Sequence, residues 1–179
     1  MRNLIAVAVL LAAAPAARAA DTTTKPSLAN EVIDIWNEEA KNLIGMAEDF
    51  PEAKFDYKPT PEVRTFAEQI LHAAGANNAF VEVAKGNKPK FEDPPRATYK
   101  TKAQVVSYLK QSIENVTSYL KGKSDAAMTQ PMKSFVDGKM ITPAVLWTAL
   151  AGHMSEHYGQ LVVYYRLNKL VPPGSRPKK

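Results

Sequence analysis

Apolar residues recur every three to four positions in four stretches of the chain, which is the spacing of amphipathic helices. These stretches predict helices over residues 27–50, 60–85, 101–122 and 142–167. The residues that form the four apolar faces are, in chain order, Ile33, Trp36, Ala40 and Leu43; Val63, Phe66, Ile70, Ala74 and Val81; Val105, Leu109, Ile113, Val116 and Leu120; and Leu146, Leu150, Leu161 and Tyr164. Four such helices can bury one another's faces, so we predict an all-α fold: one antiparallel four-helix bundle.

Local signals at the helix starts support these boundaries. Thr60 and Thr142 each precede a proline, and a threonine cap followed by a proline in the first helical position is a favourable start. Thr101 is followed three residues later by Gln104, which is a capping-box pattern. We therefore expect the second, third and fourth helices to begin at these three threonines.

The connections between the helices are less regular. Residues 88–100 contain three prolines and are predicted to form a loop. Residues 124–142 are predicted to be irregular, with a small hairpin over residues 135–141 that turns at Asp137 and Gly138.

The first nineteen residues have the pattern of a secretory signal peptide. Arg2 gives a basic start, residues 4–14 are an unbroken apolar run, and Ala17 and Ala19 offer small side chains at a cleavage site. The run is short for a membrane span, although an uncleaved anchor is the alternative. We expect residues 1–19 to be removed and residues 20–179 to form one exported, periplasmic domain without a membrane span.

Charge and composition narrow the function classes. The net charge of +5 falls to +3 once Arg2 and Arg18 are removed, which does not favour a nucleic-acid partner. Cysteine is absent, so the fold must rest on its core, and neither a thiolate nucleophile nor a thiolate metal ligand is available.

Histidine is the residue type that points to chemistry. His153 and His157 are four residues apart, so on a helix they share one face, and the rest of that face is apolar. Two buried imidazoles without partners would each cost about 1–3 kcal/mol. One divalent ion would satisfy both. Hydrogen bonding within an ordinary core is the alternative.

A third histidine could complete such a site. His72 is the only other histidine in the chain, and it lies midway along the second predicted helix. An antiparallel neighbour could bring it to the level of His153 and His157. Three imidazoles and an open position are typical of catalytic metal sites, and imidazole ligands suit zinc, nickel, copper or iron.

The last helix also fits a protease motif. The residues from His153 to His157 match H-x-x-E-H, in which Glu156 would act as a general base. Such sites need a further acidic ligand downstream, and no acidic residue follows His157. The motif is therefore incomplete, and Glu156 is interpreted first as a surface residue.

Two stretches carry a family resemblance. Residues 55–66 with 70–72, and residues 152–166 with 171–176, resemble the DinB family of metal-binding four-helix bundles. The resemblance implies that three histidines, one on the second helix and two on the last, bind a divalent metal. His72, His153 and His157 occupy those places.

The same resemblance implies candidate activities. Characterised members of the family include transferases and isomerases that use small thiols such as bacillithiol, mycothiol or glutathione, and many relatives are dimeric. The signal-peptide pattern departs from these members, because their thiols belong to the cytosol.

Three functions follow from the sequence. The first is a metal-dependent hydrolase or thiol-type transferase that acts on an unknown small molecule at the open metal position, with no catalytic residue assigned. Gln160, Tyr158 and Glu156 are supporting candidates, and each is interpreted first as structural or solvent-facing. The second is a non-catalytic metal-binding or stress-related bundle. The third is an interaction protein that forms a homodimer, in which Trp36 and Trp147 could lie at the interface, although both are interpreted first as core residues.

Overall fold

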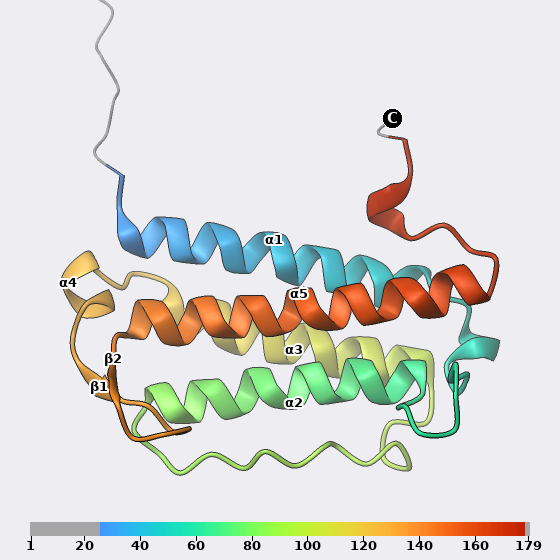
Figure 1. The fold of residues 1–179 in the computed structure, drawn as a ribbon, viewed down its shortest axis with the longest axis horizontal. Helices are drawn as coiled ribbons and strands as arrows, with labels where there is room; N and C mark the ends of the chain where they lie inside the picture. Colours follow the sequence, from blue (N-terminus) through green and yellow to red (C-terminus); the bar gives the residue numbers. More distant parts are fainter. Residues whose placement is uncertain (1–25, 178–179) are drawn as a thin grey trace, which may run out of the picture.

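A computed structural model describes residues 26–177 of the chain, and the predicted signal peptide at residues 1–19 lies outside them (Figure 1). The predicted all-α four-helix bundle is confirmed. The elements, in chain order, are α1 (Leu28–Asp49), the 3-10 turn η1 (Glu52–Lys54), α2 (Phe66–Ala84), α3 (Lys102–Leu120), α4 (Asp125–Met128), β1 (Met132–Lys133), β2 (Met140–Ile141), α5 (Pro143–Leu167) and η2 (Pro173–Ser175).

The four long helices are α1, α2, α3 and α5. Helices α1 and α2 each pack against both α3 and α5. Figure 1 shows that α1 and α5 run in one direction and α2 and α3 in the other. The neighbours α2 and α5 are therefore antiparallel, as the histidine hypothesis requires, whereas α1 and α5 are parallel. Within residues 26–177 no helix is both long and apolar enough to cross a bilayer.

The core of the bundle is rich in aromatic side chains. Trp36 and Trp147 are each 1% exposed, and the indole Nε1 of Trp36 donates to Thr117 Oγ1 on α3 at 3.0 Å. Both tryptophans are therefore core residues, which is the interpretation that the sequence favoured over a dimer interface. Phe50 stacks on Phe66 with ring centroids 3.8 Å apart, which closes the end of the bundle where α2 begins.

The start of α2 differs from the prediction. The helix begins at Phe66, because the Thr65 side chain accepts from Glu68 N at 3.2 Å while Glu68 Oε2 accepts from Thr65 N at 2.7 Å. This reciprocal capping box satisfies two backbone donors, which a cap at Thr60 would not do. Val63 consequently lies outside the helix and is 39% exposed.

The other two predicted starts are confirmed. Thr101 and Gln104 form a capping box at the start of α3, and Thr142 caps α5 with Pro143 in its first turn. The predicted hairpin is also present, but its strands lie at residues 132–133 and 140–141, so residues 134–139 form the loop. Gly138 has a φ of 71°, a conformation that favours glycine.

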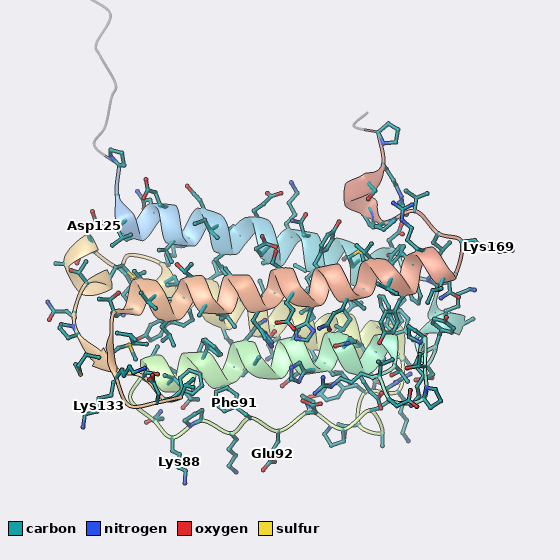
Figure 2. All side chains as sticks on the ribbon, viewed as in Figure 1. Lys88, Phe91, Glu92, Asp125, Lys133 and Lys169 are labelled. Carbon is teal, nitrogen blue, oxygen red and sulfur yellow. The ribbon has the colours of Figure 1, made fainter. Side chains whose placement is uncertain are left out.

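Residues 86–101, called the strap below, return along the length of α2 to reach the start of α3 (Figure 1). Lys88 and Glu92 extend from the strap away from α2 (Figure 2). The strap makes its closest approach at Gly75, where an added Cβ would lie 3.0 Å from Pro94 Cδ. A proline ring cannot move without its backbone, so only glycine lets the strap lie this close.

Two glycine substitutions test this packing. Gly75→Ala is expected to lower the free energy of unfolding by about 1–2 kcal/mol, because the methyl group overpacks the strap. Gly45→Ala is the matched control, since an added Cβ there meets nothing within 4 Å, and it should raise the free energy by about 0.5–1 kcal/mol. Urea unfolding measures both values. A gain in stability for both variants would contradict the close approach of the strap.

Candidate metal centre

The structure brings the three histidines together. His72 lies on α2, and His153 and His157 lie one turn apart on α5. One ring nitrogen from each histidine lies within 4.8 Å of the others. The ring centroids are 4.4 Å apart for His153 and His157, 4.9 Å for His72 and His157, and 5.4 Å for His72 and His153. The three side chains are thus placed so that they could share one ion.

Hydrogen bonds fix which nitrogen of His72 and which nitrogen of His157 faces the centre. His72 Nδ1 donates to Asp93 Oδ1 at 2.6 Å, and His157 Nδ1 donates to Gln160 Oε1 at 3.1 Å. A proton on Nδ1 leaves the Nε2 lone pair available for a cation. The Nε2 atoms of His153 and His157 face each other at 3.0 Å, near the roughly 3.4 Å that separates two nitrogens bound to one tetrahedral ion.

Burial keeps the two imidazoles on α5 neutral. Desolvation, followed by the nearby His153 and His72, lowers the pKa of His157 to about 4. Desolvation, followed by His72, also lowers the pKa of His153. Both rings therefore carry no charge at neutral pH, which is the form that binds a cation. His153 Nδ1 has no hydrogen-bond partner within residues 26–177, so contacts among the three histidines leave one buried ring nitrogen unpaired.

Asp93 on the strap is a residue that the sequence reasoning missed. Its two oxygens accept from His72 Nδ1 and, at 2.8 Å, from Arg64 Nε. Burial raises the pKa of this carboxyl, but the hydrogen bonds from His72 and Arg64 outweigh it and hold the pKa below its usual value. An ionised carboxylate behind an imidazole orients the ring and makes it a better metal ligand.

Two glutamines support the α5 side of the cluster. Gln160 Oε1 accepts from Gln69 Nε2 at 2.9 Å in addition to His157, and Gln160 Nε2 donates to Glu156 Oε1 at 3.1 Å. Gln160 is thus in contact with a histidine, as expected, whereas Glu156 reaches the cluster only through Gln160. Gln69 was missed, although it lies three residues before His72 on the same buried face.

Tyr158 does not belong to this cluster. It lies beside η2, where an added Cβ at Gly174 would be 2.6 Å from the Tyr158 hydroxyl oxygen. The side chain packs against the apolar core and the C-terminal segment. The structural interpretation of Tyr158 therefore applies, rather than a supporting role at the histidines, because position 158 faces away from the stripe that holds 153 and 157.

A cavity of about 720 Å³ adjoins the cluster at the start of α2. None of the three histidines lines it, but Gln69 and Gln160 do, and Gln160 contacts Nδ1 of His157. Val63, Val163 and Tyr164 supply apolar and aromatic wall, and Arg64 borders the cavity as well. The arrangement offers a small molecule a place beside the two glutamines that adjoin the histidine cluster.

Known structures share the fold of this chain at low sequence identity. A DinB-like protein from Bacillus cereus is 18% identical, with a TM-score of 0.69 over 82% of this chain and 97% of that one. YfiT from Bacillus subtilis, described as a probable metal-dependent hydrolase with an unusual four-helix bundle topology, is 12% identical, with a TM-score of 0.67 over 86% of this chain and 94% of YfiT.

A mycothiol-dependent maleylpyruvate isomerase is also similar in fold. It is 12% identical, with a TM-score of 0.60 over 74% of this chain and 60% of the isomerase. No curated protein sequence matches the chain. The sequence does match the DinB superfamily over residues 35–161, a region that contains all three clustered histidines. The chain therefore belongs to the DinB superfamily.

Proposed function

We propose that His72, His153 and His157 hold one divalent metal ion through their Nε2 atoms, and that the protein is a metal-dependent hydrolase of a small molecule. The observation that carries this proposal is the convergence of three imidazoles, two of which have Nδ1 tied to acceptors. Zinc, nickel and iron all suit such a donor set. Three protein ligands leave a position for water or substrate.

The chain's own residues prepare this site. Asp93 and Gln160 hold the Nδ1 protons of His72 and His157, so the two rings keep one orientation. Gln69 and Gln160 present amide groups at the cavity and can orient a substrate there. A bound divalent ion would supply Lewis acidity and a water with a pKa lowered to about 7.

Hydrolysis is favoured over thiol transfer by the expected location. We also propose that residues 1–19 are removed and that the protein acts in the periplasm, on the support of the N-terminal sequence pattern. Thiols confined to the cytosol would then not meet the protein, whereas water is present in the periplasm as a co-substrate for hydrolysis. The intact mass of chain recovered from a periplasmic extract tests this: we expect a start at Ala20, and an uncut Met1 start would contradict it.

The competing function is a metal-binding bundle without catalysis. A bundle that only holds the ion needs no open coordination position, and an ion shared by the three imidazoles would stabilise the fold by joining α2 to α5. Cobalt-substituted protein separates the two functions. Acetohydroxamate should change the visible spectrum if a coordination position is open, and the metal-loaded protein should then hydrolyse members of an ester and amide panel. An unchanged spectrum would leave the non-catalytic function.

Asp93→Ala tests the support of His72. We expect this variant to lose about 10–100-fold in zinc affinity, because the ring of His72 loses the acceptor that orients it. Competition with a chromophoric chelator measures the affinity. Asp137→Ala, which removes an exposed carboxylate from the hairpin loop, is the control and should bind zinc normally. Equal affinities in the two variants would contradict the role given to Asp93.

A further inference from the structure

We propose that Arg64 selects substrates that carry a carboxylate, which it would bind while another part of the same molecule lies at the metal. This inference rests on the function proposed above and names the substrate class of that site. It is drawn from the position of one guanidinium, which is linked to His72 through Asp93 and borders two cavities.

Arg64 is linked to the metal centre through a short chain of contacts. Its Nε donates to Asp93 Oδ2 at 2.8 Å, and the other oxygen of Asp93 accepts from His72 at 2.6 Å. The guanidinium is thereby held at a fixed place beside the cluster. Its positive charge also contributes to the lowered pKa values of His153 and His157, although less than burial does.

The rest of the guanidinium is available to a ligand. Only the Nε of Arg64 is used by Asp93, and neither Nη atom has a hydrogen-bond partner within residues 26–177. The side chain is 40% exposed. Arg64 borders both the 720 Å³ cavity and a second cavity of about 360 Å³. A pair of unused donors in a fixed fork matches the two oxygens of a carboxylate.

The wall of the larger cavity fits an acid with a short carbon chain. Pro59, Val63 and Val163 offer apolar surface, while Gln69 and Gln160 offer amide groups on the side of the histidines. Glu62 also lines the cavity, and its residue is exposed at the rim. Its negative charge repels a carboxylate ligand, whereas the positive charge of Arg64 attracts it. Glu62 should therefore weaken the binding of an acid in this cavity.

Paired ligands test the proposal on zinc-loaded full-length protein. Under this proposal, succinate places one carboxylate at the metal and the other at Arg64. Butyrate has a single carboxylate, so it can occupy only one of these two positions at a time. Calorimetry on the unaltered protein is expected to give succinate at least a ~10-fold tighter dissociation constant than butyrate, since a charge-assisted bidentate contact is gained. In Arg64→Gln this preference should fall to about 2-fold or less, with zinc content unchanged.

A second variant keeps the test decisive if Arg64→Gln binds zinc poorly. Glu62→Gln removes the opposing charge without touching Asp93, and it should tighten succinate binding by about 2-fold or more. A succinate preference that survives in Arg64→Gln, or weaker succinate binding in Glu62→Gln, would overturn the inference and leave the metal site intact. Failure of the unaltered protein to bind zinc would instead overturn the proposed function, and this inference with it.

Discussion

His157→Ala is expected to lower the affinity of the protein for zinc by more than ~100-fold. Removing a residue that only orients a ligand costs about 10–100-fold, and His157 is proposed to be a ligand itself. It is also the most enclosed of the three, 3% exposed, with Nε2 facing His153 and Nδ1 on Gln160. The two remaining histidines lie on different helices and would hold an ion poorly.

Thermal unfolding with and without zinc gives an independent measure of the same loss. Zinc present at about 1,000 times its dissociation constant should stabilise the unaltered protein by about 4 kcal/mol, because only the folded chain assembles the site. His157→Ala should show almost none of this stabilisation. Gln111→Ala, an exposed change on α3, is the control and should keep it. Equal stabilisation of both variants by zinc would mean that the ion binds elsewhere.

Phe66→Ala is expected to lower the free energy of unfolding by about 3–5 kcal/mol. Phe66 is fully buried at the first position of α2, where its ring stacks on Phe50 at 3.8 Å and lies 5.2 Å from the ring of Phe55. Losing it would leave a cavity among these rings, and the neighbours cannot close it without moving the end of α2. Urea unfolding of metal-free protein measures the effect without contributions from the site.

Val63→Ala is the matched control for this substitution. The apolar spacing assigns Val63 and Phe66 to one buried face, but Val63 is 39% exposed and outside the helix. Its truncation should therefore change the free energy of unfolding by no more than about 0.5 kcal/mol. A large loss for Val63→Ala, or a small one for Phe66→Ala, would contradict the position of the α2 boundary.

Most of the bundle could be predicted because its signals are local. The periodic apolar faces, the Thr101 capping box and the Thr142–Pro143 start each depend on residues close together in sequence. The error at α2 has a local cause too. Thr60 and Pro61 imitate a helix start, while Thr65 and Glu68 carry the capping box that the chain uses. The second signal was present in the sequence and is the stronger one, because it pairs two backbone donors at once.

The candidate site divides in the same way. The pair His153 and His157 could be predicted from their spacing on an apolar stripe, and His72 from the family resemblance. Asp93 could not, because it reaches His72 only where the strap returns along α2. Nothing in the local sequence around Pro94 and Pro95 specifies that path. The parallel direction of α2 and α3, which makes such a return necessary, is likewise a property of the whole fold.

Anomalous X-ray diffraction from crystals of the zinc-loaded, untagged protein shows directly whether three Nε2 atoms share one ion. We expect one strong peak per chain, about 2.1 Å from Nε2 of His72, His153 and His157. We also expect Asp93 and Gln160 to keep their contacts with Nδ1 of His72 and His157. No peak between the three rings at saturating zinc, or a peak bound to other residues, would contradict the shared ion.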